Sequence, residues 1–456
     1  MDINPKIFKA YDIRGIFGRD FDTEFAYNLG LAYVKLRKKE IKEDKQLKIV
    51  VAKDMRLSSD ELATSLIKGL TDGGAKVINI GLNSTPTFYF AVAYFNYDGG
   101  IIVSASHNPA EWNGFKVVRN KALPMGGETG LDILKDYILN KKLEIANIKG
   151  TVETLDDVLE TQVQYDLGFA DKTNIKPLTV VVDAANSMGA TYCQELFKYL
   201  PVKLIPINFD LDGTFPNHEA DPIKEENMKQ LQKAVIAEKA DLGIATDGDG
   251  DRIFFVDETG KSINQAIIRG VLAKIFLKDR PGSKIAYDIR PGKITEDLIR
   301  ENGGTPIITK VGHSLIKAQA VKEGAYFAGE SSGHFFLNMD IGCFEIPMIV
   351  ILKLLEEFSQ NNTTVSEYVK PYNKYFHSGE INSNVADKNK VLKEISLRYQ
   401  DGEINHLDGV TVTYKDYWFN VRPSNTEETI RLNLEAVSPE IRDIKTKEVL
   451  AIIRNK

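Results

Sequence analysis

The sequence alternates strand-like and helix-like segments three times, and this alternation limits the possible folds more than any other feature. In the first repeat, the apolar run Leu47–Ala52 precedes a segment with apolar residues at helical spacing between Leu62 and Leu70, and the strand-like run Lys76–Ile80 follows. The later repeats place strands and helices at 178–182, 189–199, 202–207, 225–238 and 241–245, and at 284–288, 293–301, 306–309, 314–322 and 325–328. This order predicts three similar α/β domains built from βαβ units with mixed sheets. A polar loop directly follows one strand of each domain, so we expect ligands to bind at the carboxyl ends of the strands.

The C-terminal part has a different pattern. After the polar stretch Ser359–Thr364, strand-like runs follow one another at hairpin-like spacing, before a final helix, at 379–385, 409–414, 418–421 and 429–436. This order predicts a smaller α+β domain. Length alone, at about 150 residues per domain, suggests about three domains for the 456 residues. The change of pattern raises the number to four, with expected ranges 1–150, 151–258, 259–370 and 371–456.

Charge and composition exclude several classes of protein. The 58 Lys and Arg against 64 Asp and Glu give a formal net charge of −6, so no overall basic field attracts nucleic acid. Two cysteines, Cys193 and Cys343, are too few for a disulfide scaffold or a thiolate metal cluster. The N-terminus has no apolar signal segment, and the most apolar run, Ile346–Leu355, is too short to cross a bilayer. We therefore expect a soluble, cytoplasmic protein with no membrane partner.

The segment 247–252, with the sequence Asp-Gly-Asp-Gly-Asp-Arg, is the sharpest chemical signal. Three carboxylates at alternate positions, Asp247, Asp249 and Asp251, can surround one hard cation, and their mutual repulsion without a cation is costly. An EF-hand is excluded because Arg252 stands where that loop requires glycine, and a P-loop is excluded because Phe255 stands where its first glycine must be. A solvated acidic turn is the alternative, but such turns seldom space their acids so regularly.

Three further loops carry polar groups, and each has an ordinary structural interpretation when taken alone. Ser104–Pro109 places hydroxyls beside an imidazole, Gly329–His334 places a carboxylate and hydroxyls between glycines, and Arg422–Thr426 offers a guanidinium, hydroxyls and an amide. Each can also be a plain turn with local hydrogen bonds. Together with the aspartates they supply a nucleophile, a polyol reader, a phosphate clamp and a metal site. This combination indicates phosphoryl transfer on a sugar phosphate.

At this point the chain resembles the α-D-phosphohexomutase superfamily, and most closely its phosphomannomutase/phosphoglucomutase branch. The resemblance spans nearly the whole chain and rests on six motifs in order: Phe8–Gly15, Ser104–Pro109, Asp247–Arg252, Lys310–His313, Gly329–His334 and Arg422–Glu427. It implies four domains around one central cleft. It also implies an isomerase that interconverts hexose 1-phosphate and hexose 6-phosphate, of mannose and/or glucose, through a phosphoserine and a hexose 1,6-bisphosphate intermediate or activator.

The resemblance also assigns residues to roles. The implied catalytic residues are Ser106, as the phosphoserine, with Arg14, His107, Lys116, Arg252 and His313. The implied Mg²⁺ ligands are Asp247, Asp249 and Asp251 with an oxygen of phosphorylated Ser106. The implied substrate contacts are Tyr11, Arg290, Gly312, His313, Glu330, Ser331, Ser332, Gly333 and His334 on the sugar, and Arg422, Ser424, Asn425 and Thr426 on the non-reacting phosphate.

Two alternatives remain from the sequence. A phosphoglucosamine mutase usually carries glycine where this chain has Asn425, and a Mg²⁺-dependent sugar phosphatase would let water take the phosphoryl group from Ser106. A catalytically silent sugar-phosphate-binding protein is disfavoured by the intact Ser106, aspartates and Arg252. Glu428 replaces the proline that often ends the phosphate loop. The expected partners are small sugar phosphates, and the expected assembly is a monomer or small homo-oligomer.

Overall fold

The computed structural model describes residues 3–43, 45–290, 292–424 and 429–454. These residues form two compact units, and each is described by itself. The first consists of Met1–Ile263 with Ser332–Ser366, and the second of Asn264–Ser331 with Glu367–Lys456. The predicted third domain, 259–370, is therefore divided between the units, and the four predicted ranges stay predictions.

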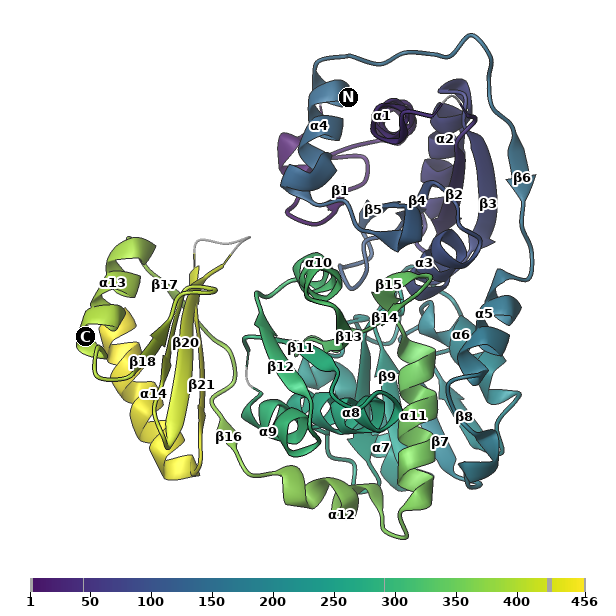
Figure 1. The fold of residues 1–456 in the computed structure, drawn as a ribbon. Helices are drawn as coiled ribbons and strands as arrows, with labels where there is room; N and C mark the ends of the chain where they lie inside the picture. Colours follow the sequence, from purple (N-terminus) through teal and green to yellow (C-terminus); the bar gives the residue numbers. More distant parts are fainter. Residues whose placement is uncertain (1–2, 44, 291, 425–428, 455–456) are drawn as a thin grey trace. The chain divides into compact units, whose positions relative to one another are not determined.

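The first unit contains two sheets with their helices, and a hairpin and a helix that come from the segment Ser332–Ser366 (Figure 1). Its elements are β1 (Ile13–Ile16), α1 (Thr23–Ile41), β2 (Lys48–Lys53), α2 (Ser59–Asp72), β3 (Lys76–Leu82), α3 (Thr85–Tyr94), β4 (Gly99–Val103), β5 (Trp112–Arg119), α4 (Asp132–Leu139), β6 (Val152–Thr154), α5 (Val158–Leu167), β7 (Thr179–Asp183), α6 (Gly189–Phe197), β8 (Lys203–Ile207), α7 (Glu225–Ala237), β9 (Leu242–Thr246), β10 (Ile253–Asp257), β14 (Phe335–Met339), β15 (Gly342–Glu345) and α11 (Pro347–Gln360).

The second unit contains an α/β part and the C-terminal sheet with its helices. Its elements are α8 (Gln265–Asp279), β11 (Lys284–Asp288), α9 (Lys293–Glu301), β12 (Thr305–Thr309), α10 (His313–Glu323), β13 (Ala325–Gly329), β16 (Phe376–His377), β17 (Ile381–Asn384), α13 (Lys388–Arg398), β18 (Glu403–Asn405), β19 (Val410–Thr413), β20 (Tyr417–Pro423), β21 (Thr429–Ala436) and α14 (Pro439–Ile453). The short helix α12 (Val365–Val369) lies where the chain passes from the first unit to the second.

The sheets are mixed, as the sequence predicts. The first has the order β1-β5-β4-β2-β3-β6, in which β4, β2, β3 and β6 are parallel and β5 and β1 antiparallel. The second has the order β10-β9-β7-β8, with β10 antiparallel. In the second unit β12, β11 and β13 are parallel, whereas the C-terminal strands pair antiparallel, which confirms the change of pattern in the tail.

Alternation along the strands decides which helices cover each face of the first sheet. Ile49 and Val51 of β2 face the core with α1, α2 and α4. On the opposite face, the ring of Phe88 in α3 lies over Gly100 of β4, where an added Cβ atom would come within 2.7 Å of the ring. Helices therefore cover both faces of the sheet, and the edge where the parallel strands end stays available for polar loops.

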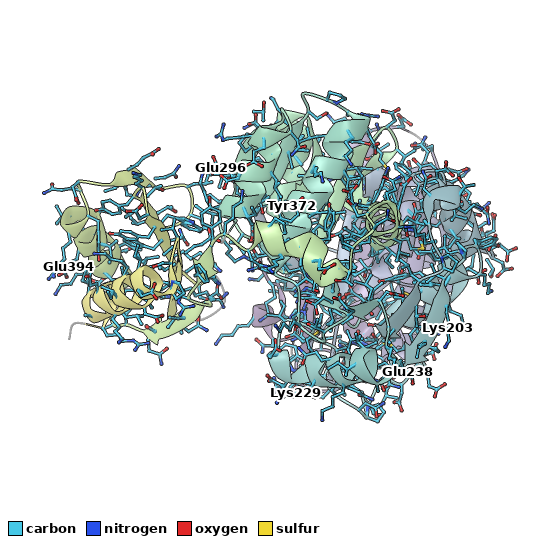
Figure 2. The ribbon with its side chains drawn as sticks, turned by 90° about the horizontal axis from the view of Figure 1, so that it is seen from below. Lys203, Lys229, Glu238, Glu296, Tyr372 and Glu394 are labelled. Atoms are coloured by element: carbon cyan, nitrogen blue, oxygen red, sulfur yellow. The ribbon has the colours of Figure 1, made fainter. Side chains whose placement is uncertain are left out.

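Charged side chains of both signs lie at the surface, and no helix among the described residues has the length and apolar character needed to cross a membrane. Figure 2 shows Lys229 of α7 and Glu238, which directly follows α7, on the same exposed side of the first unit as Lys203.

Candidate active site

Ser106 lies in the loop that follows β4. Its side chain is buried, and its Oγ donates a hydrogen bond to Oδ2 of Asp247 at 2.9 Å. The backbone of Ser106 has a φ of +52°, in the left-handed region that a serine seldom adopts. This conformation, together with a hydrogen bond from Ser106 N to Ser104 Oγ at 3.0 Å, directs the hydroxyl toward the aspartates.

The three aspartates follow β9 and are buried together. One oxygen from each of Asp247, Asp249 and Asp251 lies within 4.8 Å of the others. Gly248 allows the serine loop to come this close, because a Cβ atom there would lie 2.2 Å from the carbonyl oxygen of Ser106. The glycines between the aspartates thus allow the tight turn and also let the serine loop and the aspartate loop come close together.

The electrostatics of the aspartate cluster fit a divalent cation. Burial and repulsion from Asp251 and Asp249 raise the pKa of Asp247 above its usual range. Oδ1 of Asp249 is buried without a hydrogen-bond partner among the described residues. Lys116 Nζ supplies one counter-charge, with bonds to Asp249 and, at 2.6 Å, to Asp251. Three oxygen donors with one unsatisfied acceptor make a site for a hard cation such as Mg²⁺.

Two arginines flank the serine loop, and their hydrogen bonds differ. Arg14 is largely committed: its Nη1 donates to Oδ1 of Asn108 at 2.7 Å, and its Nε donates to Asp12 at 2.7 Å. Arg252 lies 3.8 Å from Asp247, but its Nε and Nη1 are buried without a hydrogen-bond partner among the described residues. Arg252 therefore keeps donors for a ligand.

His107 stands beside the nucleophile, with its Nδ1 3.3 Å from Ser106 Oγ. Burial, followed by the charges of Arg252 and Arg14, holds its pKa well below the usual value. The imidazole is therefore held in its neutral form, which can both donate and accept hydrogen bonds.

The predicted sugar loop is divided between the two units. Ser332, Gly333 and His334 belong to the first unit, where Ser332 Oγ lies 3.0 Å from Nδ1 of His334 and His334 Nε2 lies 3.1 Å from Asp251. The structure therefore joins this end of the loop to the aspartate cluster. Tyr11 belongs to the same unit and is half-buried.

The other predicted sugar contacts belong to the second unit. Glu330 accepts a hydrogen bond from Gly312 N at 2.8 Å, and Arg290 Nη2 lies 3.9 Å from Glu330. Ser331 Oγ donates to Asp288 at 3.0 Å. His313 is half-buried at the first turn of α10, directly after Gly312.

Arg422 is the last residue but one of β20, in the second unit. Its Nη2 donates to Glu380 at 2.9 Å, and its Nε is buried without a hydrogen-bond partner among the described residues. Burial lowers the pKa of Arg422, the carboxylate of Glu380 opposes this shift, and the nearby charge of Arg290 adds to it, so the positive fields of the two guanidinium groups overlap. This field favours an anion. Ser424 follows in the same loop, and Asn425 and Thr426 lie outside the described residues.

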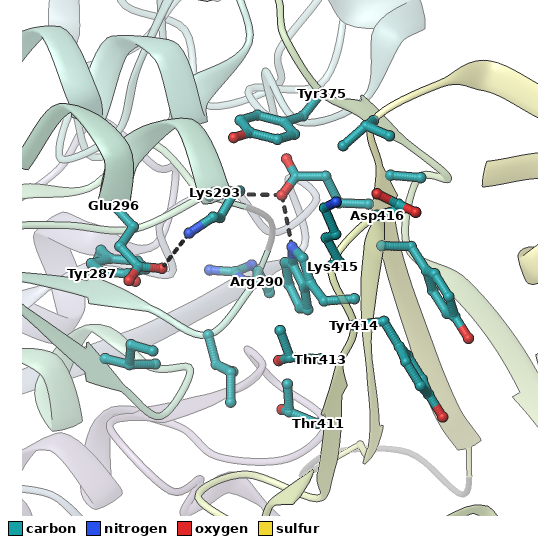
Figure 3. Close-up of a pocket in the computed structure, with 18 residues that line it drawn as sticks. Tyr287, Arg290, Lys293, Glu296, Tyr375, Thr411, Thr413, Tyr414, Lys415 and Asp416 are labelled. Atoms are coloured by element: carbon teal, nitrogen blue, oxygen red, sulfur yellow. Dashed lines mark hydrogen bonds and ion pairs between the residues drawn. The ribbon is translucent and has the colours of Figure 1, made fainter. Parts of the chain in front are cut away.

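A cavity of about 200 Å³ lies elsewhere in the second unit, between α9 and the hairpin β19–β20 (Figure 3). Its wall is mostly apolar and includes Tyr287, Tyr375 and Tyr414, and Figure 3 shows Lys293 bonded to Glu296 across one side of it. Of the predicted site residues that the structure describes, Arg290 alone lines this cavity. The cavity therefore lies apart from most of the predicted site residues.

Sequence reasoning missed several residues that contact the site. Thr85 Oγ1 donates to Asp249 at 2.5 Å, Arg56 bonds the serine loop, and Glu380 pairs with Arg422. Asp54 and Arg56 directly follow β2, so the rule that applies to polar loops after parallel strands also points to them. Nothing in the local sequence marks Thr85 or Glu380.

A buried hydroxyl, a carboxylate cluster suited to a divalent cation and arginines with unused donors, all on loops of α/β domains, define an enzyme that acts on phosphorylated substrates. Comparison with known proteins supplies the family. Models of the phosphoglucomutase/phosphomannomutase family match four successive segments: alpha/beta/alpha domain I over 5–143, domain II over 155–260, domain III over 264–375 and the C-terminal domain over 380–450.

Full-length relatives agree. The chain is 38% identical to a phosphomannomutase of Methanocaldococcus jannaschii, over 98% of this chain and 97% of the relative. It is 36% identical to a phosphomannomutase of Vibrio cholerae, over 94% of each chain. A crystal structure of a phosphoglucomutase/phosphomannomutase family protein from Burkholderia thailandensis superposes with a TM-score of 0.89 at 32% identity, covering 99% of this chain and 98% of that one. The chain belongs to the phosphoglucomutase/phosphomannomutase family of hexose phosphate mutases, which are isomerases.

Proposed function

We propose that the protein interconverts the 1- and 6-phosphates of mannose and/or glucose, with Ser106 as the residue that carries the phosphoryl group. The observation that supports this most strongly is the position of Ser106 Oγ, 2.9 Å from Asp247 in the buried aspartate cluster. A hydroxyl in a strained loop beside a metal site and a neutral imidazole is suited to phosphoryl transfer.

Asp247, Asp249 and Asp251, with an oxygen of phosphorylated Ser106, are the groups that would hold Mg²⁺. When bound, the ion supplies positive charge that offsets the charge of the phosphoryl group in the transition state. Lys116 and Arg252 add fixed positive charge on the same side, and the unused donors of Arg252 are available to phosphoryl oxygens.

In the forward half-reaction, the free hydroxyl of a hexose phosphate attacks the phosphorus on Ser106. The bond from phosphorus to Ser106 Oγ breaks as the bond to the sugar oxygen forms, and the hydroxyl proton passes to a base, for which we propose His313. His107 is neutral and its Nδ1 lies 3.3 Å from Ser106 Oγ, so it is placed to hydrogen-bond to the serine oxygen when the phosphoryl group leaves. The product is a hexose 1,6-bisphosphate, whose other phosphoryl group returns to Ser106.

The remaining predicted residues bind the sugar phosphate. We assign the sugar hydroxyls to Glu330 with the loop that contains Ser331, Ser332, Gly333 and His334, and the sugar ring to Tyr11, Arg290 and Gly312. Arg422, with Ser424, Asn425 and Thr426, grips the phosphate that does not react. The overlapping fields of Arg290 and Arg422 support this assignment.

We also propose a cytoplasmic monomer or small homo-oligomer of four domains, 1–150, 151–258, 259–370 and 371–456, with no nucleic-acid partner. Light scattering after gel filtration tests the assembly, and limited proteolysis tests the ranges.

The test of function is a comparison of kcat/KM on mannose, glucose and glucosamine 1-phosphates with Mg²⁺ and a trace of glucose 1,6-bisphosphate, with inorganic phosphate measured in parallel. We expect 6-phosphates of mannose or glucose to form much faster than phosphate is released. A clear preference for the glucosamine substrate, or phosphate release that exceeds isomerisation, contradicts the proposal.

Two measurements on the same sample address the parts of the mechanism. Intact mass spectrometry should show one phosphoryl group gained from glucose 1,6-bisphosphate and none in Ser106→Ala. Chelation should abolish turnover and added Mg²⁺ should restore it, whereas turnover that survives thorough chelation removes the metal from the proposal.

A further inference from the structure

The guanidinium of Arg56 lies beneath the serine loop and is almost wholly enclosed, with 1% of its side chain exposed. Its Nη2 donates to the carbonyl oxygens of Ser106 at 2.7 Å and Asn108 at 2.6 Å. Its Nη1 donates to the carbonyl oxygens of Pro109 at 2.8 Å and Trp112 at 2.9 Å. One side chain therefore fixes four backbone carbonyls around the nucleophile.

These contacts use all four Nη–H groups of Arg56. Its fifth donor, Nε, lies 3.3 Å from Oδ2 of Asp54. Arg56 therefore has no Nη donor left for a phosphate, and its Nε, which makes no hydrogen bond to any described residue, faces Asp54. Arg252, in contrast, keeps both Nε and Nη1 without a hydrogen-bond partner among the described residues. Arg56 and Arg252 therefore have different roles, and Arg56 binds the protein backbone.

Arg56 is itself held in place from two sides. Asp54 Oδ1 accepts hydrogen bonds from Arg56 N at 3.0 Å and from Ser59 Oγ at 2.6 Å, which fixes the carboxylate that faces the guanidinium. The ring of Phe215 packs against the guanidinium at 5.1 Å. Both neighbours belong to the first unit, so the guanidinium is held between Asp54 and Phe215 as well as by the four carbonyls.

The carbonyl of Ser106 is the point at which this support acts. Ser106 has a φ of +52°, which L-residues with a side chain disfavour, and its carbonyl lies so close to Gly248 that no Cβ atom fits there. Arg56 Nη2 is the described donor to that carbonyl. Without it, the loop loses the bond that compensates for the left-handed conformation, and Ser106 Oγ is no longer held toward Asp247.

We propose that Arg56 is a positioning residue for phosphoryl transfer: it holds the loop 106–112 so that Ser106 keeps the strained conformation that points its hydroxyl at the aspartate cluster. This inference rests on the proposed function, because it takes Ser106 as the nucleophile. It assigns Arg56 no contact with substrate or phosphate.

The test compares Arg56→Ala and Arg56→Lys with Arg37→Ala. Arg37 is an apt control because it is also a buried arginine of the same sheet domain and also donates to a backbone carbonyl, that of Asp98, through Nε and Nη2. Its loss removes a comparable guanidinium without touching the serine loop. Thermal unfolding of all three variants measures the structural cost that they share.

We expect kcat to fall about 100-fold in Arg56→Ala, the loss typical of a reacting group displaced by about 1 Å, with KM changed little because the substrate contacts remain. Arg56→Lys should recover little, since an ammonium cannot reach four carbonyls in one plane. Millimolar guanidinium chloride, compared with sodium chloride at equal ionic strength, should restore part of kcat in Arg56→Ala and none in Arg37→Ala. A merely structural residue would lower thermal stability without this kinetic pattern.

Three outcomes overturn the proposal: a normal kcat in Arg56→Ala, an equal loss of kcat in Arg37→Ala, or a rise of KM with kcat unchanged. If Arg56→Ala does not fold, Arg56→Lys decides, through the rate at which glucose 1,6-bisphosphate phosphorylates Ser106 by intact mass. An unchanged rate there refutes positioning. Failure of the proposed function is separate, because it would appear in the unmodified protein as the absence of phosphoryl transfer to Ser106.

Discussion

Replacement of Lys116 by methionine tests the electrostatic account of the aspartate cluster most directly. Lys116 Nζ contacts Asp249 and Asp251, and both carboxylates are fully buried. Burial alone would lower the pKa of Lys116, but Asp249 and Asp251 outweigh burial and hold that pKa well above its usual value. Lys116→Met keeps the length of the side chain and removes its charge, so the aspartates lose their bonded counter-ion.

Breaking a buried ion pair from one side costs about 3–5 kcal/mol, because the other charge stays buried without compensation. Lys116 pairs with two carboxylates, which favours a cost near the upper end of this range. Uptake of a proton by one aspartate would remove a negative charge and bring the cost toward the lower end. We therefore expect the free energy of unfolding of the metal-free protein to fall by about 3–5 kcal/mol. Mg²⁺ should restore much of the lost free energy of unfolding, since a ligand at 100 times its Kd stabilises a folded protein by about 2.7 kcal/mol.

Calorimetry in chelator and in Mg²⁺ measures both effects. Removal of Lys116 also removes a competitor for the carboxylates, so the rise in Tm caused by Mg²⁺ should be larger in Lys116→Met than in the unmodified protein. Lys68→Met is the matched control: Lys68 pairs with Asp72 at 2.7 Å, but its side chain is 66% exposed, so its loss should change little. Equal unfolding of Lys116→Met and the unmodified protein in chelator would refute the reasoning.

Three other changes give sharp expectations. Ser106→Ala should lose most mutase activity while keeping the fold, which circular dichroism and the coupled assay check together; near-normal turnover refutes the assignment of the nucleophile. Arg422→Ala should raise KM for phosphorylated sugars, since a guanidinium with an unused buried Nε is lost, and unchanged kinetics would count against the phosphate clamp. Asp166→Asn should stabilise the protein at pH 7: burial raises the pKa of Asp166 well above that of the unfolded chain, so the folded protein loses stability as pH rises above about 4, and the variant does not. Thermal melts from pH 4 to 8 should diverge as pH rises, and parallel curves would contradict this.

The loops of the candidate site were predictable because their residues follow strands of a recognisable pattern. β11 and α9 have the bounds that the sequence predicts, and Ser106 and Lys116 both contact the aspartate cluster. The succession of strands and helices along the chain, and the positions where strands end, follow from short-range apolar patterns, which a single sequence displays.

Two helices were not predictable for a physical reason. α3 and α8 are buried along most of their surface, so their apolar residues show no one-sided spacing. Hydrogen bonds of small polar side chains are also hard to predict: Ser58 is the N-cap residue of α2 but makes no side-chain cap bond, and the Ser59 hydroxyl donates to Asp54. Arg56 was missed because its partners are backbone carbonyls, which leave no signature in the sequence.

If Arg14, Arg290 and Arg422 bind the substrate as proposed, their ion pairs explain how an acidic protein can bind dianionic sugars and still release them. Arg14 pairs with Asp12, Arg290 with Asp288, and Arg422 with Glu380, so each cation is partly neutralised before a substrate arrives. A phosphate must compete with these carboxylates, which lowers affinity without removing the bidentate geometry that recognises it. A mutase needs this balance, since its bisphosphate must be held through two transfers and its monophosphate product must leave. Replacement of Glu380 by glutamine should therefore tighten phosphate binding and slow product release, so that KM and kcat fall together.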